Sequence, residues 1–86
     1  MEKSAKILNE SGMHARPAGA FVKMATSFTS DIQIETNGKT LNAKSIMNLL
    51  SLGLKKDDEI RIIANGDDEK EAVEALANLV NSKFGE

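Results

Sequence analysis

An Asn-Gly dipeptide at positions 37–38 separates two short segments in which apolar and polar residues alternate. Ile32 and Ile34 fall on one face of segment 31–36, and segment 39–42 follows the dipeptide. Asn-Gly between such segments is the strongest short-range signal for a two-residue hairpin turn. The sequence therefore predicts an antiparallel hairpin over residues 31–42, so the sheet to which it belongs is not all parallel.

Two further segments show the period of a β-strand. Segment 4–8 carries Ala5 and Ile7 on one face, and segment 59–64 carries Ile60 and Ile62 on one face. Side chains two positions apart share a face of a strand, so each segment has one face suited to burial. With the hairpin, these segments give four expected strands.

Three helices are expected from apolar residues spaced three and four positions apart and from end signals. The first runs over about 15–27. The second, over about 46–52, is followed by Gly53, which is the usual left-handed residue after a helix. The third begins after Asp68, within a variant of the capping-box pattern, and runs to about Lys83.

The predicted order is strand, helix, strand, strand, helix, strand, helix. Strands that are not all parallel, together with helices that each need one covered face, imply an α+β layer structure. We expect the helices on one face of the sheet and solvent on the other. At 86 residues, the chain is expected to form a single domain over 1–86.

Composition excludes several classes of function. The formal net charge is −2 and only 3% of residues are aromatic, which argues against a nucleic-acid-binding protein. There is no cysteine and only one histidine, so we expect neither a metal site nor a cofactor. The sequence has no signal-peptide core and no apolar run near the roughly 20 residues of a membrane span, so we expect a cytoplasmic domain without membrane insertion.

The single histidine, His14, lies in the run Gly-Met-His-Ala-Arg-Pro at positions 12–17, where the first helix should begin. A histidine at such a place is most often a surface or capping residue. Here its neighbours favour a function. A helix start offers unpaired N–H groups and positive potential, Pro17 suits the first turn, and the guanidinium of Arg16 matches phosphate oxygens. Neutral imidazole is a nucleophile, so this arrangement predicts a residue that accepts and passes on a phosphoryl group.

The loop around this histidine supplies further candidates for the phosphate site, namely Ser11, Gly12 and Ala15. Ser11 is suited to donating a hydrogen bond to a phosphorylated histidine. It suits ordinary turn chemistry equally well, and both interpretations stay open.

Two segments carry a resemblance to a known family. Segment 12–18 resembles the active-site signature of HPr, the histidine phosphocarriers of the phosphoenolpyruvate:sugar phosphotransferase system. Segments 37–47 and 51–54 resemble the regulatory-serine region of the same family. The resemblance implies an open-faced β-sandwich, with a four-stranded antiparallel sheet and three helices on one face. It also implies that His14 accepts phosphate from phospho-enzyme I and donates it to enzyme IIA proteins or domains.

Ser45 precedes the second helix, and serine is among the best N-cap residues, so capping alone explains it. The resemblance adds a second role. In many Gram-positive bacteria an HPr kinase/phosphorylase modifies the matching serine, and the modified carrier binds a catabolite-control repressor. By the same resemblance, this serine segment also occurs in family members without that regulation.

The resemblance also implies a docking surface formed by the first two helices and the loop before the first. Leu49 and Leu52 provide a pair facing the core, which leaves other apolar residues of the second helix for partners. Lysines nearby are suited to steering acidic partners, although plain solvation also explains them. The expected surface consists of Arg16, Ala20, Lys23, Lys44, Ile46, Met47 and Leu50.

Other functions remain as alternatives. A nitrogen-branch paralogue of HPr would use the same histidine to serve regulators, and a serine-regulated binding module would not need it. An independent enzyme is disfavoured because the domain is too small for a deep substrate pocket. We expect a monomer.

Overall fold

The order of elements agrees with the predicted order. The computed structural model describes residues 1–85, and within them the strands are β1 (Glu2–Lys6), β2 (Asp31–Thr36), β3 (Lys39–Asn42) and β4 (Glu59–Asn65). The helices are α1 (Ala15–Thr26), α2 (Ile46–Ser51) and α3 (Glu69–Asn81), followed by a short 3-10 helix, η1 (Lys83–Gly85). The helices of this part of the chain are all too short or too polar to cross a membrane.

The four strands form one antiparallel sheet in the order β1-β4-β2-β3. The predicted hairpin joins β2 to β3, with Ile34 opposite Leu41. Asn37 and Gly38 have φ angles of 51° and 78°, which are the positive values that a type I′ turn requires at both central positions. β4 pairs with β2 on one side and β1 on the other, so it lies inside the sheet.

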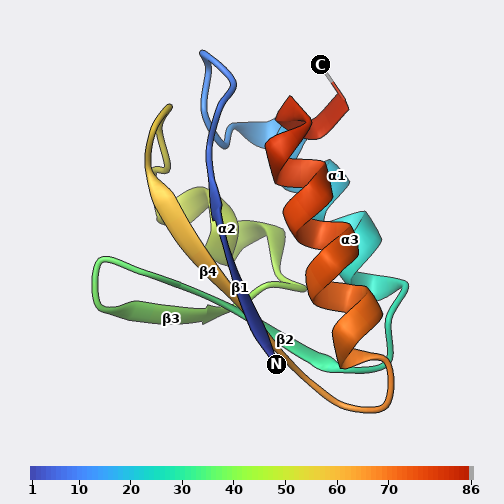
Figure 1. Cartoon of the computed structure of the whole chain (residues 1–86). Helices are drawn as coiled ribbons and strands as arrows, with labels where there is room; N and C mark the ends of the chain where they lie inside the picture. The colour runs from blue at the N-terminus through green and yellow to red at the C-terminus, as the bar shows by residue number, and fades with distance from the viewer. Residues whose placement is uncertain (86) are drawn as a thin grey trace.

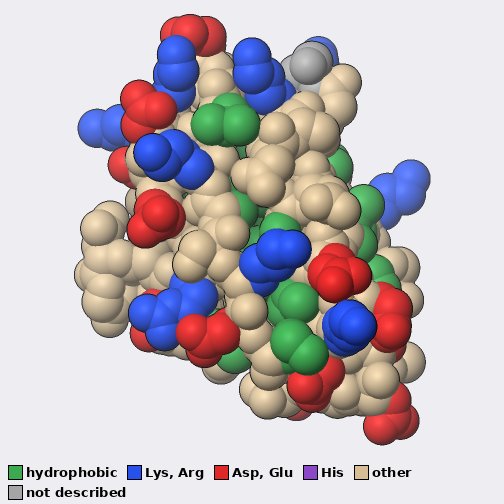
Figure 2. Space-filling model, viewed as in Figure 1, with side chains coloured by type: hydrophobic (Ala, Val, Ile, Leu, Met, Phe, Trp, Pro, Cys, Tyr) green, Lys and Arg blue, Asp and Glu red, His purple; other side chains and the backbone are tan. Residues whose placement is uncertain are grey.

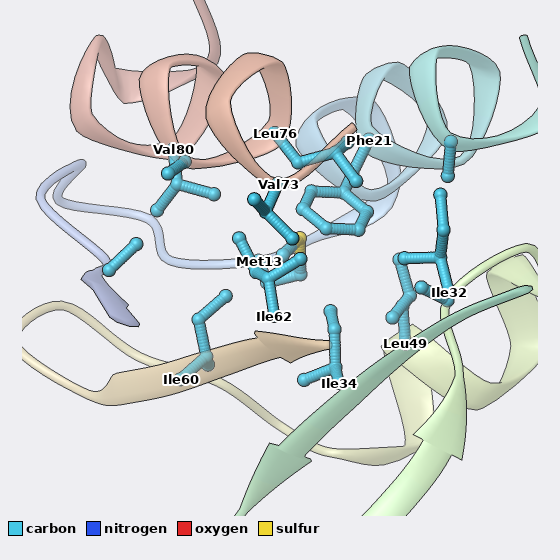
Figure 3. Packing of buried hydrophobic residues seen from close by; sticks show 14 of the residues in the cluster. Met13, Phe21, Ile32, Ile34, Leu49, Ile60, Ile62, Val73, Leu76 and Val80 are labelled. Atoms are coloured by element: carbon cyan, nitrogen blue, oxygen red, sulfur yellow. The ribbon is translucent and has the colours of Figure 1, made fainter. Parts of the chain in front are cut away.

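Helices cover one face of the sheet, and the other face is open. Along β2 and β4 the buried side chains alternate with exposed ones, as strands with one covered face require. Figure 1 shows α1 and α3 side by side on the same side of the sheet. The buried residues of all three helices join the inward residues of the strands in one cluster, in which Phe21, Leu49 and Leu76 are fully buried. Figure 3 shows Phe21 and Leu76 pointing from their helices toward the strands, and Leu49 beside Ile32.

The start of α3 differs from the predicted capping box. Asp68 is the N-cap residue, but its carboxylate accepts hydrogen bonds from the N–H groups of Thr29 and Ser30, at 2.9 and 3.0 Å, and from the Ser30 hydroxyl. The side chain therefore ties α3 to the loop before β2 instead of closing the first turn of its own helix. Glu69 accepts from the Gly66 N–H at 3.2 Å. The capping-box prediction was wrong.

Candidate functional site

His14 is the N-cap residue of α1, as the sequence predicted for the start of that helix. Its backbone is extended, with φ −92° and ψ −169°, and its carbonyl oxygen accepts the first helical hydrogen bond, from the Ala18 N–H at 2.9 Å. The residue is exposed. Helix geometry gives the N–H groups of Ala15 and Arg16 no acceptor within the helix. An exposed imidazole thus stands at the positive end of a 12-residue helix.

Pro17 and Arg16 have different environments in the same first turn. The side chain of Pro17 is fully buried, which anchors the turn to the core. Pro17 is also the third helical residue, where a backbone N–H would have no helical acceptor, so the missing donor costs nothing. Arg16 is exposed, and its guanidinium can reach an anion bound near the helix start without first losing a buried contact.

The loop before His14 is seated on the loop that joins α2 to β4. Gly12 has φ +67°, and a side chain there would overlap the Leu54 carbonyl oxygen and lie 2.9 Å from Lys55 Cα. The Met13 N–H donates to the Leu54 carbonyl at 3.0 Å. The Met13 side chain is buried, and Figure 3 shows it in the core beside Val73. Glycine is therefore required at position 12 both for its φ angle and for the close approach of the two loops.

An ion pair adds to the contact between these loops. Lys56 Nζ lies 2.8 Å from Glu10 Oε1, and both groups are exposed. The hydrogen bond from Lys56 lowers the pKa of Glu10, and the same bond raises the pKa of Lys56. Ser11, next in the loop, is exposed, which leaves both interpretations of its hydroxyl open.

Ser45 caps α2. Its hydroxyl oxygen accepts a hydrogen bond from the Asn48 N–H at 3.3 Å, and its carbonyl accepts from the Leu49 N–H at 3.2 Å. The residue is half-buried. The capping interpretation is thus confirmed, while the regulatory one stays a prediction.

The apolar residues proposed for docking are exposed. Met47 is 74% exposed, whereas Ile46 and Leu50 are 39% and 38% exposed. Leu49 is fully buried and Leu52 packs against the core, as predicted. Among residues 1–85, the large exposed hydrophobic side chains are these three and Met1, so most of them gather on α2.

The other members of the docking set come mainly from α1, which packs against α2. Ala20 is half-buried and Lys23 is exposed. A side chain at Gly19 would meet Ile46 Cδ1 at 3.9 Å, so Ile46 lies beside this glycine. Lys44 has a structural contact that sequence reasoning missed, because its ammonium group donates to the Phe28 carbonyl at 2.8 Å.

Charges elsewhere on the surface are mixed. On the face seen in Figure 2, Lys and Arg side chains are interspersed with Asp and Glu. Within residues 1–85, no three His, Cys, Asp or Glu side chains gather closely enough to hold a metal ion.

Comparisons with known proteins agree with this geometry. The family model described as "PTS HPr component phosphorylation site" matches residues 1–82. HPr from Thermoanaerobacter tengcongensis is similar at 48% identity and a TM-score of 0.96, covering 100% of this chain and 97% of its own. Phosphocarrier protein HPr from Bacillus anthracis is 45% identical, with a TM-score of 0.89. The match covers 93% of this chain and 95% of the Bacillus anthracis chain.

A third relative is the catabolite repression protein Crh of Bacillus subtilis, whose structure is described as a dimer with a swapped domain. It is 48% identical, with a TM-score of 0.78, and the match covers 87% of this chain and 86% of the Crh chain.

The fold and the site together define a class of protein: a small α+β carrier domain with an exposed histidine at the start of a helix. The chain belongs to the HPr family of phosphocarriers of the phosphotransferase system.

Proposed function

We propose that this chain accepts a phosphoryl group on His14 from phospho-enzyme I and donates it to enzyme IIA proteins or domains of sugar transporters. The observation that carries the proposal is the exposed imidazole at the N-cap of α1, with Arg16 in the same turn. In this role the chain is a carrier within a relay and not an independent enzyme. The proposal places the relay in the cytoplasm.

The chemistry follows from the helix start. A ring nitrogen of neutral His14 attacks phosphorus, a P–N bond forms, and the bond from phosphorus to the donor atom breaks with its electron pair left on the donor. The second ring nitrogen keeps its proton. The backbone N–H groups of Ala15 and Arg16 and the Arg16 guanidinium face the charge on the phosphoryl oxygens. Donation to enzyme IIA is the same step with this chain as donor.

Partners dock on the surface formed by α1 and α2. The exposed Ile46, Met47 and Leu50 supply apolar contact, and methionine adapts its shape to several different partners. Lys23, exposed on α1, together with Arg16, suits partners with acidic surfaces. Lys44 keeps its positive charge, but its ammonium group is held by the Phe28 carbonyl, so a direct ion pair with a partner would require this hydrogen bond to break.

Ser45 is proposed as a second phosphorylation site that regulates the relay. Its position at the start of α2 tolerates negative charge, and it lies directly beside Ile46 of the docking surface. An HPr kinase/phosphorylase would add the phosphate, and a catabolite-control repressor would bind the product. The similarity to a catabolite repression protein supports this part of the proposal.

Labelling with phosphoenolpyruvate and enzyme I tests the central step. We expect wild type to take up acid-labile, base-stable phosphate, His14→Ala to take up none, and the exposed control Thr40→Ala to match wild type. Circular dichroism checks that each variant is folded. An unlabelled wild type would refute the proposal. Faster labelling by a nitrogen-branch enzyme I than by the sugar-branch enzyme would assign the carrier to the regulatory branch instead.

A further inference from the structure

Asn9 is a buried polar residue in the loop between β1 and α1. It follows β1, and only 4% of its surface is exposed. A buried amide is costly unless it is hydrogen-bonded, so the contacts of this side chain reveal its role. Asn9 Nδ2 donates to the Gly12 carbonyl at 2.6 Å, and the Asn9 carbonyl accepts from the Gly12 N–H at 3.1 Å. One residue therefore holds both backbone polar groups of Gly12.

The Gly12–Met13 peptide is consequently held at both ends. Its carbonyl oxygen accepts from Asn9 Nδ2, and its N–H donates to the Leu54 carbonyl at 3.0 Å. A rotation of this peptide plane would break both hydrogen bonds. Met13 directly precedes His14, and its side chain is buried in the core. The orientation of the peptide thus determines where the chain enters α1.

We propose that Asn9 is a positioning residue for phosphoryl transfer at His14, an inference that rests on the proposed function above. By fixing the Gly12–Met13 peptide, the Asn9 amide holds the N-cap backbone, and with it the imidazole, relative to the N–H groups of Ala15 and Arg16. Transfer requires the ring nitrogen, phosphorus and these donors to be aligned. A displacement of about 1 Å is enough to slow such a reaction by up to a hundredfold.

The docking surface lies on α1 and α2, so loss of the Asn9 amide should leave partner binding in place. For Asn9→Ala, with this chain as the varied substrate of phospho-enzyme I, we expect kcat to fall by about tenfold or more and KM to change little. Amide exchange at Met13 should become faster. Asn9→Asp keeps the size of the side chain but removes the donor, so it should be slow as well, and it replaces Asn9→Ala if that variant does not fold.

A matched control separates positioning from general stability. Ser30→Ala removes a buried hydroxyl that donates to Asp68, near the far end of α1 from His14, and it should keep the wild-type kcat. The inference is overturned if kcat is unchanged in the Asn9 variants, if Asn9→Asp is as fast as wild type, or if Ser30→Ala slows equally. If wild type itself is not phosphorylated, the proposed function fails, which is a distinguishable result.

Discussion

At the scale of single residues, several contacts that hold the loops and helices in place join residues far apart in sequence. Gly12 fits against the Leu54 carbonyl, Lys44 binds the Phe28 carbonyl, and Asp68 binds Ser30, which is 38 positions away. The pKa of Asp68 falls from 3.8 to about 2. The main cause is the hydrogen bond from the Ser30 hydroxyl, and the second is the hydrogen bond from the Thr29 N–H. The unfolded chain lacks these donors and so binds a proton at higher pH.

This pKa shift predicts an acid-sensitive contribution to stability. Because the folded-state pKa is the lower one, the stabilisation is complete above about pH 4 and is lost as the pH falls toward about 2. Ser30→Ala should raise the pKa of Asp68 and flatten this part of the pH profile. Urea unfolding between pH 2 and 6 measures the effect. Ser51→Ala, which removes an exposed hydroxyl bonded to the Asn48 carbonyl, should keep the wild-type slope. The same slope in both variants would contradict the assignment to Asp68.

At the scale of helices and strands, α1 and α2 have separate roles at their N-termini. The N-cap of α1 is His14, and that of α2 is Ser45, whose hydroxyl closes the first turn. Charge added at Ser45 meets favourable potential from α2 itself, so the fold should persist. The effect is expected on partners that approach the neighbouring docking residues.

Ser45→Asp tests this expectation, because aspartate caps a helix as well as serine does while adding a negative charge. We expect an unchanged circular dichroism spectrum and transfer from phospho-enzyme I slower by about fivefold, since one unfavourable charge pair near the surface costs on the order of 1 kcal/mol. Ser45→Asn caps without charge and should transfer at the wild-type rate. Equal rates for the two variants would show that charge at this position does not regulate the relay.

Most elements were predictable because their signals are local. Neighbouring residues alone indicate the turn at Asn37 and Gly38 and the strand that carries Ile60 and Ile62. They also indicate the end of α2, which Gly53 follows. The location of His14 at a helix start was predictable for the same reason. The role of Asp68 was predicted wrongly and that of Lys44 was missed, because nothing in local spacing indicates a partner across the fold. Asn9 was missed for another reason: its partner Gly12 is only three positions away, but the burial of the Asn9 side chain depends on the whole fold. The strand order β1-β4-β2-β3 is non-local in the same sense.

At the scale of the whole molecule, the covered face of the sheet provides the core and the helix layer provides the site. The open face carries an ion-pair group in which Arg61 contacts Glu2 and Glu35, at 3.4 and 3.0 Å. The edge strands carry exposed lysines, Lys3 in β1 and Lys39 in β3. Lysine at a sheet edge opposes pairing with the edge of another molecule.

We therefore propose a monomer. Light scattering should give 9.3 kDa at all concentrations from micromolar to millimolar. A mass near twice that value at high concentration would contradict the prediction and would resemble the dimer described for Crh. Lys39→Val removes a charge from the β3 edge and should shift the mass upward if lysines are what keep the edges apart.

The register of β1 has a consequence for biosynthesis. Its hydrogen-bonded neighbour is β4, and Glu2 pairs with Ile63. Once synthesised, β1 must therefore wait for more than fifty further residues before its neighbour exists, roughly 3 to 11 seconds at translation rates of about 5 to 20 residues per second. During that interval β1 carries unpaired backbone groups. The carrier site, whose loop directly follows β1 and is held by the Leu54 carbonyl, acquires its final shape only after the segment before β4 has been synthesised.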